Sequence, residues 1–148
     1  MADSIAKQSE TEEFCKSYVA SELIEEPEDL DALIQEHQKQ SPGLVFLLLS
    51  TDWCPDCVRG SPRVFPALAA VAQKAQKHAT LLKLDCGKRE QWRSPDHAYR
   101  FNPLLHTKSI PTLYHVGSDG KVLDRLVEAA LYAPQESLPA FLEKAFQR

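Results

Sequence analysis

Two cysteines three positions apart, where an apolar run gives way to a helical pattern, constrain this chain more than any other feature. Residues 44–49 form a continuous apolar run bounded by turn residues, which predicts a strand buried on both faces. The stretch Trp53-Cys54-Pro55-Asp56-Cys57 follows directly, and a helix is expected from about residue 54 to 77. A helix N-terminus offers free N–H groups and partial positive charge to a thiolate. The pattern therefore predicts two thiols that form and break a disulfide.

The composition is that of an ordinary globular protein. The 148 residues are 43% hydrophobic and 26% charged, which favours one domain with a sufficient core. The formal net charge of −4 argues against nucleic acid or an anionic membrane as a partner. No stretch has the roughly 18 apolar residues of a membrane span, and residues 1–8 lack the apolar core of a secretory signal. We therefore expect a cytoplasmic protein.

The rest of the chain alternates predicted strands and helices. Residues 1–15 are polar and are expected to be mobile or loosely helical, and residues 16–148 to form a single domain. Strands are predicted at 17–24, 44–49, 80–85, 111–116 and 121–127, and helices at 27–40, 54–77, 95–101 and from Pro134 onward. Residues 117–120, Gly-Ser-Asp-Gly, predict a hairpin turn. Alternating units predict a parallel part of the sheet, to which the hairpin adds antiparallel strands.

Two prolines extend the cysteine motif into a longer pattern. Pro62 follows the second cysteine by five residues, and Ile110-Pro111 opens a predicted strand ahead of the hairpin. Together with Trp53 and the order of elements, these residues resemble the thioredoxin superfamily. The resemblance implies an α/β thioredoxin fold, with a central mixed sheet of four to five strands flanked by helices on both faces. It also implies that Pro111 is cis, that the Ile110 backbone pairs with an extended substrate, and that Trp53 forms one wall of the binding surface.

A narrower resemblance is to the thioredoxin-related proteins with a Trp-Cys-Pro-Asp-Cys active site, the fourteen-kilodalton type called Clot in plants. Residues 53–58 are similar to that active site, and residues 87–95, Gly-Lys-Arg-Glu-Gln-Trp-Arg-Ser-Pro, resemble the family's Gly-x-x-x-x-Trp-x-x-Pro segment. The similarity covers residues 40–130. This chain lacks the family's insertion of small and polar residues before Trp53, which leaves the family's substrate choice open for it.

The two cysteines have different expected roles. Cys54, at the first turn of the helix, is the candidate nucleophile, and Cys57 is the resolving thiol. Attack of Cys54 on a substrate disulfide gives a mixed disulfide, which Cys57 then displaces. Pro55 and Asp56 tune the pair. The Asp56 carboxylate repels a thiolate, but it also lies where the helix dipole favours an anion.

The position that usually holds a buried acid carries none here. Thioredoxins place this acid six residues before the first cysteine, where it assists proton transfer to the resolving thiol, and this chain has Leu48 at that position. Asp52, Asp56 or water is left as the proton acceptor for Cys57. We therefore expect slower resolution of mixed disulfides.

The leading hypothesis is a monomeric disulfide reductase that acts on small-molecule or protein disulfides and holds no cofactor. The chain has no dinucleotide-binding Gly-x-Gly-x-x-Gly, so electrons are expected from NADPH through a separate thioredoxin reductase or another dithiol reductant. The alternative is a thioredoxin-like interaction module whose cysteine pair only senses redox state, without catalytic turnover.

Other chemically active residues have plainer interpretations. A structural zinc site needs four ligands, and Cys15 and Cys86 stand alone in the sequence. Cys86 is expected to be an inert core thiol, and Cys15, in a mobile segment, a thiol open to intermolecular disulfides. The basic residues between 87 and 108 predict a solvated loop surface, and the alternative is a patch for an anionic substrate or partner.

Overall fold

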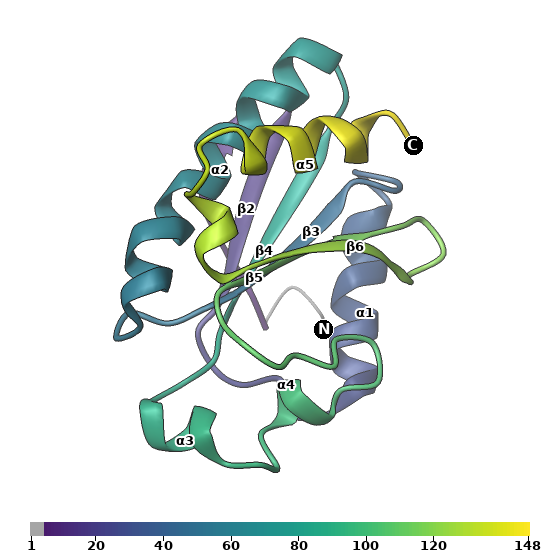
Figure 1. Ribbon diagram of the computed structural model, residues 1–148. Helices are drawn as coiled ribbons and strands as arrows, with labels where there is room; N and C mark the ends of the chain where they lie inside the picture. Colours follow the sequence, from purple (N-terminus) through teal and green to yellow (C-terminus); the bar gives the residue numbers. More distant parts are fainter. Residues whose placement is uncertain (1–4) are drawn as a thin grey trace.

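The protein folds into a sheet with helices on both of its faces (Figure 1). The computed structural model describes residues 5–148. The strands are β1 (Lys7–Glu12), β2 (Cys15–Ala20), β3 (Val45–Ser50), β4 (Ala79–Asp85), β5 (Thr112–Val116) and β6 (Val122–Val127). The helices are α1 (Pro27–Gln38), α2 (Pro55–Ala75), α3 (Arg89–Arg93), α4 (Ala98–Phe101), the 3-10 helix η2 (Glu128–Leu131) and α5 (Ser137–Phe146).

The sheet is mixed, as the sequence predicted. Its strand order is β1-β2-β4-β3-β5-β6. Strands β2, β4 and β3 are parallel, whereas β1, β5 and β6 pair antiparallel with their neighbours. The predicted hairpin joins β5 to β6, with Gly120 at φ +84° in its turn, a conformation that glycine adopts without strain.

The apolar run before the cysteines forms the central strand β3, and its side chains contribute to two separate hydrophobic cores. Leu47 and Leu49 of β3 pack in the core that α1 covers, whereas Phe46 and Leu48 pack in the core under α2 and α5. Successive strand residues point to opposite faces, so a strand covered on both sides must be apolar throughout. This explains why residues 44–49 show no polar alternation.

One strand was not predicted. The sequence suggested four to five strands and a mobile or loosely helical segment over residues 1–15, but Lys7–Glu12 forms β1 at the edge of a six-stranded sheet. All six side chains of β1 are exposed, so the strand depends on backbone pairing with β2 and leaves no hydrophobic pattern. Residues 1–4 of that prediction lie outside the described part of the chain.

Smaller differences lie at the ends of elements. Strand β2 ends at Ala20 rather than at residue 24, and the chain then leaves the sheet, where the Ile24 N–H donates a hydrogen bond to the Tyr99 hydroxyl (3.0 Å). The segment 87–108 holds two short helices, α3 and α4, instead of one. Pro134 does not open the last helix, which begins at Ser137 after η2.

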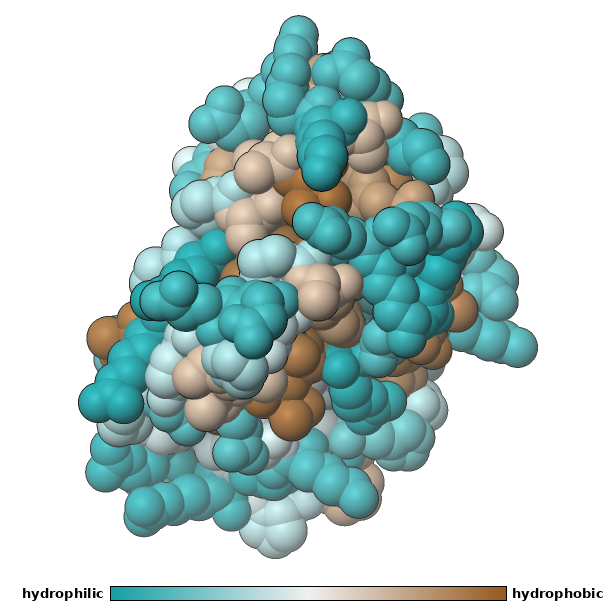
Figure 2. Space-filling view, turned by 45° about the horizontal axis from the view of Figure 1, so that its top comes forward, coloured by the Kyte–Doolittle hydropathy of each residue, from teal (hydrophilic) through white to brown (hydrophobic). Residues whose placement is uncertain are grey.

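The surface is polar between small apolar areas. In the space-filling view of Figure 2, hydrophilic residues predominate and hydrophobic residues show between them in small areas. Among residues 5–148, the large apolar residues that are exposed are Val58, Phe101, Leu123 and Val127.

Candidate active site

The two cysteines lie where β3 passes into α2. Cys54 is the N-cap of α2, with φ −88° and ψ 122°, and Pro55 occupies the first helical position, where its missing N–H costs nothing. Cys57 follows within the first turn. Cys54 is half-buried and Cys57 is 1% exposed, and both are free thiols. Only one of the two sulfurs is therefore open to a large substrate.

The loop before β5 lies against Cys54. The Cys54 Sγ is 3.8 Å from the carbonyl oxygen of Ile110, and the Ile110–Pro111 bond is cis, the conformation that the resemblance implied. Strand β5 is the direct neighbour of β3 in the sheet, so strand pairing brings residues 110 and 54 together across 56 positions of sequence.

Trp53 connects the cysteine pair to the segment after β4. Its Nε1 donates a hydrogen bond to the carbonyl oxygen of Gly87 (2.8 Å), and the guanidinium carbon of Arg89 lies 5.2 Å from the centre of its ring. Gly87 has φ +84°, in the region that favours glycine. The segment that begins at Gly87 is therefore held next to the cysteine pair.

Burial keeps the second thiol protonated. Desolvation raises the pKa of Cys57 to about 11, and hydrogen bonds from the Thr51 backbone and the Ser50 side chain oppose this only in part. The Thr51 hydroxyl lies 3.9 Å from the Cys57 Sγ. The Ser50 and Ser61 hydroxyls are hydrogen-bonded at 2.5 Å. Cys57 must lose its proton before it can attack, and the groups beside it are hydroxyls.

The acids that the sequence offered as proton acceptors are not beside the Cys57 sulfur. Leu48 is buried in the core under α2. The Asp56 carboxylate accepts a hydrogen bond from the Tyr132 hydroxyl (2.5 Å), and Asp52 is exposed. A cavity of about 480 Å³ lies between the sheet and α2, with Leu48, Ser50, Thr51, Asp52 and Ser61 among its lining residues. Water in this cavity would reach the hydroxyls next to Cys57.

Tyr132 is a residue of the site that was not predicted from the sequence. It lies 76 positions from Asp56, just after η2, and no local pattern connects the two. The packing of η2 against α2 brings them together: a Cβ placed on Gly60 would lie 2.9 Å from the Leu131 Cβ. The absence of a side chain at Gly60 is the one local sign of this close approach.

The other two cysteines are core residues. Cys86 is fully buried in the core that also contains Cys57, as predicted for an inert thiol, and burial raises its pKa. Cys15 is 1% exposed at the start of β2, and burial raises its pKa to about 12. The expectation that Cys15 lies in a mobile segment open to other chains is therefore wrong.

Neither a metal site nor a membrane helix is found in residues 5–148. No three of their His, Cys, Asp and Glu side chains are grouped so that they could hold a metal ion. None of the described helices is long and apolar enough to cross a membrane.

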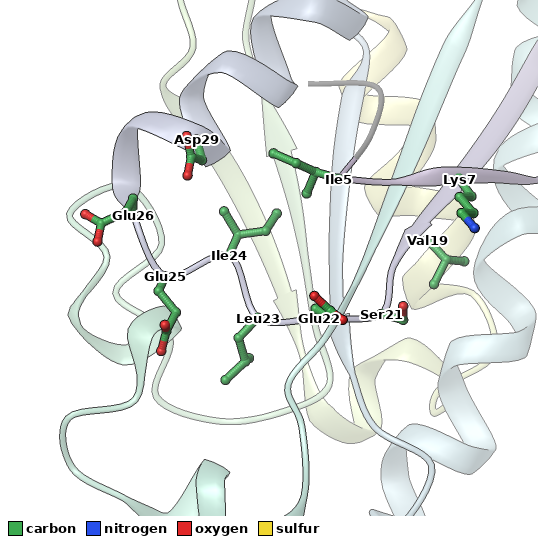
Figure 3. Close-up of a pocket in the computed structure, with 10 residues that line it drawn as sticks. All are labelled: Ile5, Lys7, Val19, Ser21, Glu22, Leu23, Ile24, Glu25, Glu26 and Asp29. Carbon is green, nitrogen blue, oxygen red and sulfur yellow. The ribbon is translucent and has the colours of Figure 1, made fainter. Parts of the chain in front are cut away.

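A cavity of about 730 Å³ lies between the ends of β1 and β2 and the start of α1 (Figure 3). Its lining includes Glu22, Glu25, Glu26 and Asp29 but neither Cys54 nor Cys57, so it is separate from the cysteine pair.

The order of strands and the facing Cys54 and Pro111 loops place this chain among the thioredoxin-fold proteins. The same fold is found in chloroplast thioredoxin f from spinach (TM-score 0.51, 16% identity, 75% of this chain and 82% of that one). It is also found in oxidised thioredoxin from Plasmodium falciparum (TM-score 0.50, 18% identity, 85% and 94%). At these identities the likeness shows the fold alone.

The particular family follows from the sequence match. Residues 23–135 match the thioredoxin domain of the thioredoxin domain-containing protein 17-like family, and the chain belongs to this family. The thioredoxin-like protein Clot of Arabidopsis thaliana is 27% identical over 124 residues, which cover 76% of this chain and 89% of that protein. The Clot protein of Oryza sativa subsp. japonica is 34% identical over 61 residues, 41% of this chain and 44% of that one. The resemblance seen in the sequence is thus confirmed, and the family supports a thioredoxin-like redox function.

Proposed function

We propose that this protein reduces disulfides catalytically through the Cys54 and Cys57 thiols. The observation that carries the proposal is the unequal burial of the pair: Cys54 is half-buried beside the Ile110 carbonyl, whereas Cys57 is 1% exposed behind it. A substrate disulfide reaches the first sulfur and not the second. This order of access is what a nucleophile and a resolving thiol require.

The reaction transfers two electrons in two exchanges. The Cys54 thiolate attacks one sulfur of the substrate disulfide, a mixed disulfide forms, and the other substrate sulfur leaves as a thiolate that takes up a proton. Cys57 gives up its proton, attacks the Cys54 sulfur and releases the second substrate thiol. The substrate disulfide is thereby reduced to two thiols, and the Cys54–Cys57 dithiol is oxidised to a disulfide.

The oxidised protein needs an external source of two electrons. No cofactor is required on this chain, because an incoming dithiol restores the Cys54–Cys57 pair by the same exchange in reverse. We assign this step to thioredoxin reductase or another dithiol reductant. The proposed setting is the cytoplasm, with the protein acting as a monomer on small-molecule or protein disulfides.

One observation favours a second candidate function, a redox-sensing module without turnover. Leu48 stands where a proton-accepting acid would assist the resolving thiol, and burial raises the pKa of Cys57 to about 11. Both features slow the second exchange. If that step were slow enough, the pair would respond to oxidation and bind partners without turning substrates over.

Steady-state turnover distinguishes the two functions. We expect many turnovers of 2-hydroxyethyl disulfide per protein molecule with NADPH and thioredoxin reductase, or with dithiothreitol as the reductant. Cys54→Ser should abolish turnover, Cys57→Ser should leave the substrate covalently bound to Cys54, and Cys86→Ser should retain activity. A single stoichiometric oxidation with no further reduction would support the sensor instead.

A further inference from the structure

The segment next to the cysteine pair is basic in an acidic protein. Residues 87–108 carry five Lys or Arg and two Asp or Glu, a formal charge of +3, so the rest of the chain carries −7 to give the total of −4. Lys88, Arg89, Arg93 and Lys108 are exposed. Residues 87–108 are therefore a basic stretch next to the cysteine pair; a second basic stretch, residues 57–84, has five Lys or Arg and no Asp or Glu.

Hydrogen bonds and ring contacts hold this stretch in place beside the active site. Trp53 binds the Gly87 carbonyl, and Arg89 lies over the Trp53 ring. Further along, the Arg100 guanidinium stacks on Trp92 at 3.9 Å and donates to the carbonyl oxygens of Trp92 (2.9 Å) and Lys108 (3.2 Å). The backbone that carries the cations is thus held in place relative to Cys54.

Within residues 5–148, no carboxylate forms an ion pair with these cations. The ion pairs among residues 5–148 join Lys39, Lys83, Lys144 and Arg148 to acids elsewhere and involve no cation of the segment. The hydrogen bond between Ile24 and Tyr99 brings the acidic residues of 22–29 near the segment, but none of the ion pairs within residues 5–148 joins them to its cations. Near the cysteines, Asp56 is engaged by Tyr132 and Asp52 points to solvent.

We propose that the basic segment, residues 87–108, selects protein disulfides that are flanked by acidic residues. The inference rests on the proposed reductase function and names the substrate class of the same site. Carboxylates on either side of a substrate disulfide would lie over Lys88 and Arg89 while the disulfide meets Cys54. An uncompensated charged surface next to a reactive group raises the rate of encounter with substrates of the opposite charge.

A polypeptide fits this segment better than a small anion. The segment exposes four cations, Lys88, Arg89, Arg93 and Lys108, which is more than one small anion can neutralise, so several carboxylates on one chain match them better. The segment also exposes 69% of the Phe101 side chain, an apolar contact for a polypeptide.

The test compares two peptides that differ only in charge. Each contains one disulfide, flanked by glutamates in one peptide and by lysines in the other, and dithiothreitol serves as an uncharged reductant. We expect kcat/KM for the acidic peptide to exceed that for the basic peptide by about tenfold at 50 mM salt. At 0.5 M salt the ratio should approach one, because the screening length becomes shorter than the distance between the charges.

Charge variants test whether residues 87–108 cause the preference for the acidic peptide. In the double variant Lys88→Glu/Arg89→Glu the ratio of acidic to basic peptide should fall to one or invert, whereas Arg89→Lys should keep it. The control Lys74→Glu/Lys77→Glu makes the same charge change at the far end of α2, where Lys74 lies about 30 Å along the helix from Cys54, and should keep the ratio. Because the two peptides are compared within each variant, a general loss of activity does not change the ratio of their kcat/KM values.

The possible failures are distinguishable. Turnover of 2-hydroxyethyl disulfide without any preference between the peptides would overturn the substrate assignment and leave the reductase function standing. A preference that survives the double variant would place the selecting surface elsewhere and also overturn it. Absence of turnover with every disulfide would overturn the reductase function and the substrate assignment together.

Discussion

Asp56 and Cys57 are adjacent in the first turn of α2, yet the Cys57 side chain lies in an apolar environment and the Asp56 side chain in a polar one. Cys57 points into the apolar core that contains Leu49 and Ile110, whereas Asp56 reaches the Tyr132 hydroxyl. A helix turns its side chains by about 100° per residue, so neighbours in a single turn face different surroundings. The chemistry of the site depends on this division, because burial raises the pKa of the Cys57 thiol, whereas the Asp56 carboxylate accepts a hydrogen bond from Tyr132.

The buried Cys57 thiol predicts how stability depends on pH. Its folded pKa, about 11, lies above the ordinary value near 9, so the folded state retains a proton that the unfolded state loses. This contribution to stability is full below pH 9 and disappears as pH rises toward 11. In the oxidised protein Cys57 has no thiol to titrate. We expect the stability of the reduced protein relative to the oxidised protein to decrease between pH 9 and 11.

Urea unfolding of both redox forms, at pH values from 7 to 10.5, measures this difference. The buried Cys15 titrates in both forms and therefore cancels in the comparison. A difference that stays constant across this range would show that Cys57 is not held protonated by burial.

The hydrogen bond between Tyr132 and Asp56 predicts an energetic coupling between two segments. A hydrogen bond to a charged group in a partly buried place contributes about 1 kcal/mol or more to stability. We expect Tyr132→Phe and Asp56→Asn to lower the free energy of unfolding singly, and the double variant to lose about 1 kcal/mol less than the sum. Urea unfolding of the wild type, the two single variants and the double variant completes this double-mutant cycle. Additive losses would show that the two groups do not interact in solution.

At the scale of the element, α2 is shaped by its neighbour η2. Gly60 lies in the middle of a helix, where alanine is favoured by about 1 kcal/mol, but an added Cβ would lie 2.9 Å from the Leu131 Cβ and 3.4 Å from Tyr132. The close contact outweighs the helical preference, because overpacking costs about 1–3 kcal/mol. The element that carries the cysteines is thus positioned by its contact with the 3-10 helix.

Substituting Gly60 tests this positioning. We expect Gly60→Ala to lower the free energy of unfolding by about 1 kcal/mol and to reduce the turnover of 2-hydroxyethyl disulfide, since α2 must move away from η2. Adding Leu131→Gly, which removes the Leu131 Cβ, should relieve the contact, so the double variant should be more stable than additivity predicts. Urea unfolding measures the change in stability, and steady-state rates measure the change in turnover. An increase in stability with Gly60→Ala would show that the helix tolerates the added methyl group without moving.

The elements differ in how far the sequence predicts them, for physical reasons. Strand β3 is predictable because both of its faces are covered, and α1 because Leu30, Leu33 and Ile34 recur on its buried side. Strand β1 is not, since its exposed side chains carry no pattern and its partner is chosen by backbone pairing. Likewise, the Cys54–Cys57 spacing is visible in the sequence, whereas the Asp56–Tyr132 contact depends on tertiary packing.

At the scale of the whole molecule, one sheet separates two cores and connects them. Side chains of β3 alternate between the core with α1 and the core with α2 and α5. The two cores share the same strands, so loss of packing in one core exposes one face of strands whose opposite face forms the other core. We therefore expect the two cores to open as one unit, and the single domain over residues 16–148 stays a prediction from the sequence.

The two buried cysteines outside the active site make this cooperativity measurable. Cys86 lies in the core with α1 and Cys15 in the core with α2, and neither is more than 1% exposed. In the variant Cys54→Ser/Cys57→Ser, alkylation must wait for opening of the fold. We expect both thiols to react at the same rate, thousands of times more slowly than in urea, with the same dependence on added urea. Peptide mass spectrometry reports each site separately. If Cys15 reacted early and without dependence on urea, β1 and β2 would open by themselves, and the two cores would not form one cooperative unit.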